Sequence, residues 1–181
     1  VDLPAFPLFV LFSVTMGMTS VIPEMDPSRP ARVDPAKIVQ AIQEYRVTNT
    51  FGSPAIWNRV APYCIERGVR LPSIRRILIA GAPVPWRVIE QLRSVIRAEA
   101  DVHTPYGATE ALPVSSISGA ELAGGLCERS LRGAGTCVGR PLPTVDVRII
   151  RIVDAPIAAW STADQLPVGE IGEIGEIVVS G

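Results

Sequence analysis

The apolar residues in the first half of the chain alternate between short continuous runs and the 3.6-residue spacing of amphipathic helices. After Asp34-Pro35, a helix cap followed by a first-turn proline, the residues Ile38, Ile42 and Tyr45 fall on one helical face. Further helices are expected at 55–67, where Pro62 marks a kink or boundary, and at 86–98, while apolar runs predict strands at 47–51, 74–80 and 102–105. This alternation predicts an α/β fold, a parallel sheet flanked by helices.

The pattern changes beyond residue 118. Residues 119–134 are rich in glycine and small side chains and predict a loop-rich connection, with room for a helical turn at 120–126. Val145 to Ile149 alternates with period two, as in a half-buried antiparallel strand, and a bulge is expected at Ile149-Ile150. Gly-Glu-Ile occurs three times within 169–177, where we expect a turn and then the entry to a strand. We therefore divide the chain into an α/β subdomain at 1–118, a connection at 119–134 and an all-β unit at 135–181.

The opening stretch from Leu3 to Pro23 contains no charged residue and is long enough to cross a membrane. Pro4 and Pro7 would break its first turns, and no basic flank accompanies it. The stretch instead predicts a buried helix of a larger protein, with Met16 and Met18 filling core gaps. Both ends of the sequence look cut through folded structure, so we expect it to be a piece of that protein.

Charge and cysteine content exclude several function classes. The 17 Lys and Arg residues nearly balance 18 Asp and Glu residues, which leaves no global field to recruit nucleic acid or an anionic membrane. Three cysteines without Cys-x-x-Cys spacing and a single histidine, His103, favour neither a zinc site nor a disulfide framework. A reducing cytoplasm is the expected location, and His103 is expected to be structural.

Candidate chemistry lies where the predicted strands end. In parallel sheets ligands bind at the carboxyl ends of the strands, and both Gly81-Ala82-Pro83 and Tyr106-Gly107 follow strands of this sheet. Glu110 is the only charged residue between Asp101 and Glu121 and directly follows Thr109. A hydroxyl donor beside a carboxylate suits a phosphate oxygen and a magnesium ion, and phosphoryl or nucleotidyl transfer requires both.

The stretch Tyr106-Gly107-Ala108-Thr109-Glu110 resembles the Tyr-Gly-x-Thr-Glu motif of the adenylate-forming superfamily, which includes acyl-CoA synthetases and luciferases. Leu3-Pro4-Ala5-Phe6, Gly81-Ala82-Pro83 and the segments 138–143 and 172–179 resemble further family segments in the same order. The resemblance spans nearly the whole chain. It implies part of the large N-terminal domain of these enzymes, with 135–181 as the start of a small β-barrel subdomain.

The resemblance also implies roles for individual residues and the cofactors ATP and Mg²⁺. Glu110 would coordinate the magnesium ion, and Thr109 would donate to the α-phosphate. Phe6 and Phe9 are candidates for an acyl pocket. The residues implied in nucleotide binding are Gly81, Ala82, Pro83, Thr104, Tyr106, Gly107, Ala108 and Thr109.

Pro7 stands where acyl-CoA synthetases commonly carry histidine, and proline has neither an imidazole nor an amide hydrogen. This departure, together with the strings around residues 6–9, 21–27 and 106–114, resembles the β-lactone synthetase branch of bacterial olefin biosynthesis. That branch implies a long-chain 3-hydroxy acid as substrate and allows assembly with other pathway enzymes. An acyl-CoA synthetase or fatty acyl-AMP ligase, a non-catalytic nucleotide or lipid binding module, and a structural domain without ligand remain alternatives. The phosphate loop, hinge and C-terminal lysine of the family are not in these residues, so alone they are expected to be inactive.

Overall fold

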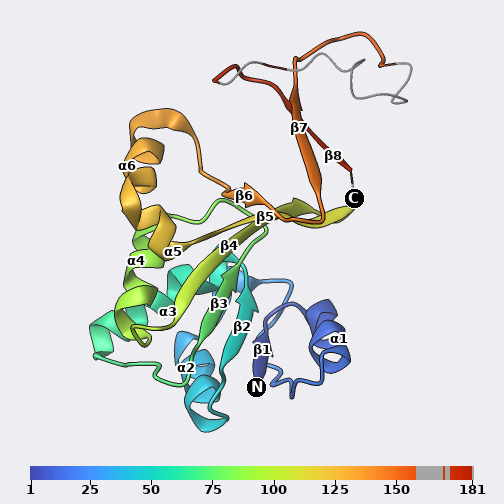
Figure 1. The fold of residues 1–181 in the computed structure, drawn as a ribbon. Helices are drawn as coiled ribbons and strands as arrows, with labels where there is room; N and C mark the ends of the chain where they lie inside the picture. Colours follow the sequence, from blue (N-terminus) through green and yellow to red (C-terminus); the bar gives the residue numbers. More distant parts are fainter. Residues whose placement is uncertain (158–168, 170–171, 181) are drawn as a thin grey trace.

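A computed structural model describes residues 1–157, 169 and 172–180 of the chain (Figure 1). Strands and helices alternate through the first half. The strands of that half are β1 (Asp2–Pro4), β2 (Asn49–Gly52), β3 (Arg76–Ile79), β4 (Asp101–Ala108) and β5 (Ala111–Ser118). The helices are α1 (Pro7–Thr15), a 3-10 turn at Pro30–Arg32, α2 (Pro35–Glu44), α3 (Pro54–Arg67) and α4 (Trp86–Val95).

The main sheet has the order β1-β2-β3-β4-β5-β6, where β6 is the short strand Arg140–Pro141. Strands β1 to β4 are parallel, with Thr50 paired to Ile77 and Ile77 to Val102. Strand β5 returns antiparallel to β4 through a tight hairpin, and β6 pairs antiparallel to β5. The parallel sheet and its helices are as expected, whereas the antiparallel extension was not. Its cause is the Thr109-Glu110 turn, which is too short for the crossover that a parallel strand needs.

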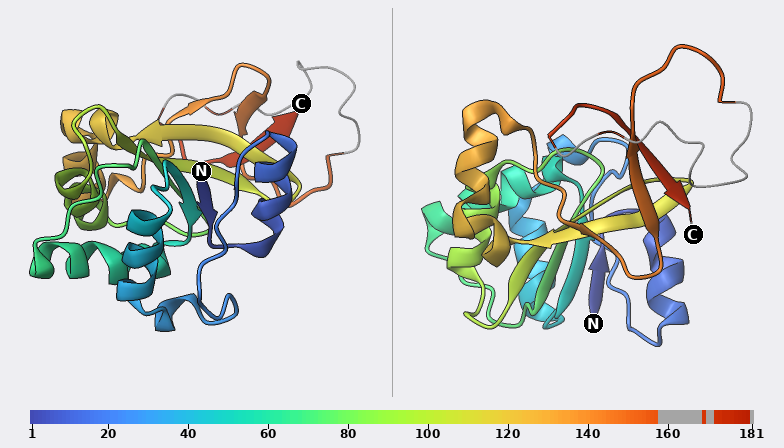
Figure 2. Two further views of the ribbon diagram at one scale, coloured as in Figure 1. Left: turned by 90° about the horizontal axis from the view of Figure 1, so that it is seen from below. Right: turned by 45° about the horizontal axis from the view of Figure 1, so that its top comes forward.

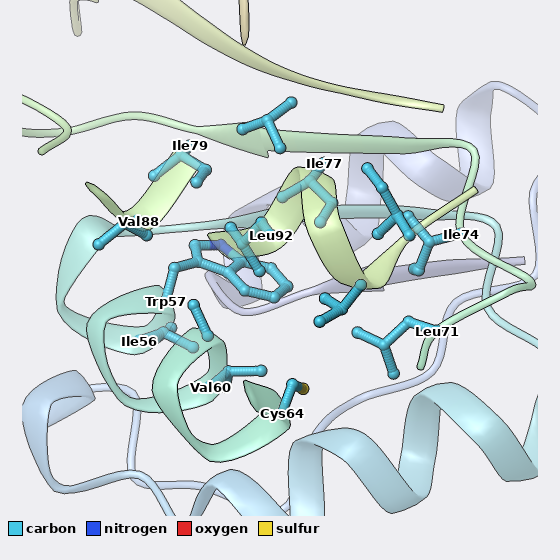
Figure 3. Close-up of a cluster of buried hydrophobic side chains, with 14 of the residues drawn as sticks. Ile56, Trp57, Val60, Cys64, Leu71, Ile74, Ile77, Ile79, Val88 and Leu92 are labelled. Atoms are coloured by element: carbon cyan, nitrogen blue, oxygen red, sulfur yellow. The ribbon is translucent and has the colours of Figure 1, made fainter. Parts of the chain in front are cut away.

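One apolar core joins the sheet to helices α2, α3 and α4, which lie on one side of it (Figure 2). Trp57, Ile77 and Leu92 are each at most 1% exposed and bring α3, β3 and α4 together (Figure 3). Local signals set the helix ends as expected. Asp34 caps α2 by accepting from the amide of Ala36, and Gly68 ends α3 in a left-handed conformation. Helix α3 continues through Pro62, so that proline is not a boundary.

Helix α1 was expected to be buried, but within the described residues one of its faces is exposed. It lies beside β1, away from α3 and α4 (Figures 1 and 2), and its outer face is exposed among the described residues. Leu8 and Leu11 are both 64% exposed, and Met16 is 66% exposed. These three side chains are therefore not part of a core within this part of the chain. None of the helices in the described ranges combines the length and the hydropathy that a membrane crossing needs.

The region after β5 is more helical than its glycine content indicated. The ranges are α5 (Gly119–Glu121), Leu122–Leu126, α6 (Cys127–Arg129) and Ser130–Ala134, with breaks at Gly124-Gly125 and Gly133. Ser118 and Glu121 form a reciprocal cap that starts this stretch, a signal that composition alone hides. The glycines interrupt the helix without abolishing it.

A separate two-stranded antiparallel sheet pairs β7 (Asp146–Ile150) with β8 (Glu176–Ser180). The expected strand at 145–149 and the strand entry in the last Gly-Glu-Ile copy are confirmed. The bulge expected at Ile149-Ile150 is wrong, since the pairing runs without a shift from Asp146 to Ile150. Gly172, in the second copy, lies in a turn, while Glu170 and Ile171 of the first copy fall outside the described residues. The division into domains stays a prediction.

Candidate active site at the carboxyl edge of the sheet

A pocket of about 880 Å³ opens at the carboxyl ends of β2, β3 and β4. Ten of the eleven residues predicted for the site line it. They come from α1 and the residue before it (Phe9, Phe6), the turn after β3 (Gly81, Ala82, Pro83) and the end of β4 with its turn (Thr104, Tyr106, Gly107, Ala108, Thr109). The eleventh, Glu110, directly follows Thr109 and is not part of the lining. The volume falls within the range of pockets that enclose small-molecule ligands.

The turn after β3 forms one side of the pocket. Gly81 has a φ of +93°, a conformation that glycine adopts without penalty, and a Cβ there would meet no atom within 4 Å. Ala82 and Pro83 follow it at the surface. The short turn therefore presents backbone and small side chains to the pocket, which suits close approach of a planar ring.

The hairpin between β4 and β5 forms a second side. The β4–β5 register is irregular between Tyr106 and Ala108. A Cβ on Gly107 would lie 2.4 Å from the carbonyl oxygen of Ala111 and 2.9 Å from Leu112 Cδ1. Gly107, which the family resemblance implies in nucleotide binding, lines the pocket, and its close contact is with the returning strand. Gly107 thus fixes the hairpin that places Tyr106 and Thr109 at the pocket.

Glu110 and Thr109 form the two-residue hairpin turn between the paired residues Ala108 and Ala111. The Glu110 side chain is exposed and has no ion pair or hydrogen bond to another described residue. Its carboxylate is therefore not engaged by any other described side chain. No cluster of three or more His, Cys, Asp or Glu side chains exists in the described ranges. A lone carboxylate fits Mg²⁺, which is commonly held by one or two carboxylates together with the phosphates of its substrate.

Three phenylalanines form the apolar wall. Phe9 stacks on Phe51 with ring centroids 3.9 Å apart and an interplanar angle of 21°. Phe6 lies 5.9 Å from Phe51 and 6.2 Å from Phe9, measured between centroids. Phe51 was missed as a pocket residue in the sequence, although it directly precedes Gly52 at the carboxyl end of a predicted strand. The wall is suited to an alkyl chain.

A buried carboxylate holds α1, and with it Phe6 and Phe9, against the sheet. Asp2 on β1 is 3% exposed and accepts hydrogen bonds from Ser13 of α1 and from Asn49 of β2, the latter at 2.6 Å. The Asp2 amide and carbonyl also bond to Thr19 and Val21. Burial of a carboxylate costs free energy unless its oxygens accept hydrogen bonds. The bond from Ser13 therefore stabilises α1 in its position against β1.

The last wall comes from the segment 122–138, which the sequence did not indicate. Leu122, Cys127, Ser130 and Leu131 of its helical part line the pocket, as do Thr136, Cys137 and Val138 beyond it. The Ser115 hydroxyl donates to the Val138 carbonyl at 2.7 Å, which ties the end of the segment to β5. His103 does not line the pocket, and burial is the largest cause that lowers its pKa below the usual value. Arg75 and Arg76 are exposed at the amino end of β3, remote from the pocket mouth along the strand.

Comparisons with known proteins identify the family of this chain. The family described as AMP-binding enzyme matches residues 5–181. The chain is 51% identical over 178 residues to an olefin beta-lactone synthetase of Stenotrophomonas maltophilia and 48% identical over 174 residues to that of Xanthomonas campestris pv. campestris. Each match covers 96% of this chain but only 31% and 30% of the relative, so the chain spans about a third of their length.

Among solved structures, the o-succinylbenzoate CoA synthetase of Bacillus subtilis in complex with ATP and magnesium ion superposes with a TM-score of 0.64 at 27% identity. That match covers 99% of this chain and 32% of the synthetase. An amide bond synthetase of Marinactinospora thermotolerans superposes with a TM-score of 0.71, covering 98% of this chain and 32% of its own, and at 24% identity it supports the fold alone. The mixed sheet flanked by helices is thus shared with a third of each larger enzyme.

Proposed function

Because this chain belongs to the AMP-binding enzyme family, we propose that the full-length protein activates a long-chain 2-alkyl-3-hydroxy acid as its acyl-adenylate and closes it to a β-lactone. One observation carries this proposal: a single pocket gathers the glycine turn after β3, the hairpin with Thr109 and an aromatic wall. The about one-half identity to two olefin beta-lactone synthetases supports the choice of product. The function is that of the whole protein, of which these residues are one part.

The residues divide between the two halves of an acyl-adenylate. The Gly81–Pro83 turn and the Tyr106 ring bind the adenine, because backbone and an aromatic face suit a planar base. Thr109, which lines the pocket, would donate its hydroxyl to the α-phosphate, and Glu110, next to it in the turn, would hold the magnesium ion. Magnesium and ATP supply an electrophilic phosphorus with a good leaving group, pyrophosphate. Phe6, Phe9 and Phe51 bind the alkyl chain and keep water from the reacting carbonyl.

The second step needs no further substrate. The 3-hydroxyl of the bound acid attacks its own activated carbonyl and a C–O bond forms. The bond from the carbonyl carbon to the phosphate oxygen breaks, AMP leaves with that oxygen, and the hydroxyl proton passes to the AMP phosphate or to water. Since nucleophile and carbonyl belong to one molecule, correct positioning can contribute about 7–11 kcal/mol in favourable systems, part of which offsets ring strain. The pocket's task is therefore to hold the alkyl branches so that the hydroxyl faces the carbonyl.

The identity of residue 7, a proline, supports the choice of lactone closure over thioester formation. Pro7 is the first residue of α1, it is exposed, and it does not line the pocket. It offers neither a donor nor a base to an incoming thiol. A fatty acyl-CoA synthetase or acyl-AMP ligase is the second candidate, because the pocket geometry serves any acyl-adenylate.

Product analysis of the full-length protein tests the proposal. With ATP, Mg²⁺ and a long-chain 2-alkyl-3-hydroxy acid but no coenzyme A, we expect β-lactone, AMP and pyrophosphate in equal amounts. The matched acid without its 3-hydroxyl should support pyrophosphate exchange yet give no lactone. An absolute requirement for coenzyme A would identify a ligase instead, and absence of ATP consumption with either acid would reject the enzyme.

A further inference from the structure

The three cysteines occupy two different environments. Cys127, the first residue of α6, and Cys137, in the segment that leads to β6, both line the pocket and are partly exposed. Cys64 lies inside α3, is 0% exposed, and burial raises the pKa of its thiol to about 11. Two cysteines therefore line the cavity, while the third, Cys64, is an internal control within the same chain.

The position of Cys137 is fixed by its neighbours. Val138 accepts the hydrogen bond from Ser115 at 2.7 Å, and Gly139 approaches β5 so closely that a Cβ there would lie 2.2 Å from the Ser116 carbonyl oxygen. Cys137 also packs against the main core cluster. The backbone at Cys137 is thus held at the pocket wall by a segment anchored to the sheet.

Cys127 reaches the same cavity from the helical stretch. It lies between the breaks at Gly124-Gly125 and Gly133, and Leu122, Ser130 and Leu131 of that stretch also line the pocket. Within the described residues neither thiol is in a disulfide. Both are therefore free to react with an occupant of the cavity.

We propose that Cys127 and Cys137 form a covalent modification site in the pocket wall, and that β-lactones are the electrophiles it takes up. The inference rests on the proposed function, since the reaction would release a strained acyl compound beside these thiols. A thiolate sulfur attacks the lactone carbonyl, a C–S bond forms, the ring C–O bond breaks, and the thiol proton passes to the freed 3-hydroxyl oxygen. The adduct is a 3-hydroxy thioester that contains the whole lactone, and no other reactant is needed.

The position of the two cysteines in the pocket wall explains why this capture would be specific. The thiolate form of a cysteine is the nucleophile, and it must meet the lactone carbonyl. Binding in the cavity raises the local concentration of the electrophile, which favours these two thiols over exposed ones elsewhere. The consequence is gradual inactivation by product.

Mass spectrometry of the full-length protein tests the site without relying on catalysis. A synthetic long-chain β-lactone is added without ATP, and peptides that contain each cysteine are analysed over time, with iodoacetamide as a small probe in parallel. We expect the full lactone mass on the Cys127 or Cys137 peptide and none on the Cys64 peptide. C127S and C137S should each remove the adduct at its own position. An acyl-sulfamoyl adenosine analogue should occupy the pocket and protect both cysteines from the lactone and from iodoacetamide. At about 100 times its Kd about one per cent of the pockets stay free, so labelling of Cys127 and of Cys137 should slow about 100-fold.

Modification of Cys64 at an equal rate, no adduct on either pocket thiol, or labelling that the analogue does not slow would each overturn the proposal. Pyrophosphate exchange, measured on a portion of the same preparation that has received no lactone, reports separately on the proposed function. Active exchange without an adduct rejects only the thiol site, and an adduct without exchange rejects only the enzyme activity.

Discussion

Replacing Gly107 by alanine should disable the hairpin that carries Thr109 and Glu110. The new Cβ would lie 2.4 Å from the Ala111 carbonyl oxygen and 3.1 Å from Leu112 Cα, and both of these are backbone atoms. Reaching the 3.0 Å below which Cβ contacts are essentially never seen requires the two strands to separate by about half an ångström. Such overpacking costs about 1–3 kcal/mol, and a shift of this size in a positioning element lowers adenylation about 10- to 100-fold.

The matched control for this prediction is Gly124→Ala. Gly124 has a φ of −72°, and a Cβ there would meet no atom within 4 Å, so alanine fits without strain or contact. It should leave ATP–pyrophosphate exchange unchanged and alter the free energy of unfolding by less than about 1 kcal/mol. Both variants are compared in the full-length enzyme by exchange rate and thermal unfolding. Equal exchange rates in the two variants would refute the positioning role of Gly107.

Three further predictions concern the wall, the anchor of α1 and the histidine. Phe51→Leu should raise the KM for the long-chain acid severalfold but not the KM for ATP, and equal rises would contradict an acyl wall. Ser13→Ala removes a hydrogen-bond donor from buried Asp2 and should lower the free energy of unfolding, measured with denaturant, by about 1.5–3 kcal/mol. The control Thr15→Ala, at an exposed position of the same helix, should lower it by about 0.5 kcal/mol or less, and equal losses would disprove the anchor. Burial lowers the His103 pKa, so the folded state binds fewer protons than the unfolded state and stability should fall as pH drops below about 6.5. His103→Gln should flatten that slope, and an unchanged slope would contradict it.

Local signals predicted the elements that depend on local physics. Asp34 begins α2 because its side chain accepts from a free amide of the first turn, and Gly68 ends α3 because glycine readily takes the left-handed conformation found there. Neither effect depends on what the helix packs against. The candidate site followed from strand order, because loops at the carboxyl ends of adjacent parallel strands necessarily meet. The turns at Gly81 and at Tyr106-Gly107 could therefore be placed together without coordinates, although the sequence did not show that the second turn belongs to a hairpin.

Features that depend on contacts far apart in the chain were not predictable. Phe51 joined the wall only because α1 brings Phe9 onto it from 42 positions earlier in the sequence. The segment 122–138 has no apolar period to mark it, since glycines interrupt its helical turns. Apolar composition in α1 predicted a buried face, but composition cannot say which neighbour covers it.

The account depends most directly on Glu110 as the magnesium ligand. In the full-length enzyme, Glu110→Gln should lower ATP–pyrophosphate exchange at least about 100-fold, because loss of a metal ligand removes several kcal/mol of charge stabilisation. Glu90→Gln is the control, since Glu90 is an exposed glutamate of α4 that does not line the pocket. Higher Mg²⁺ concentration should restore part of the lost rate in the Glu110 variant alone. Exchange equal to that of Glu90→Gln at every Mg²⁺ concentration would contradict the account.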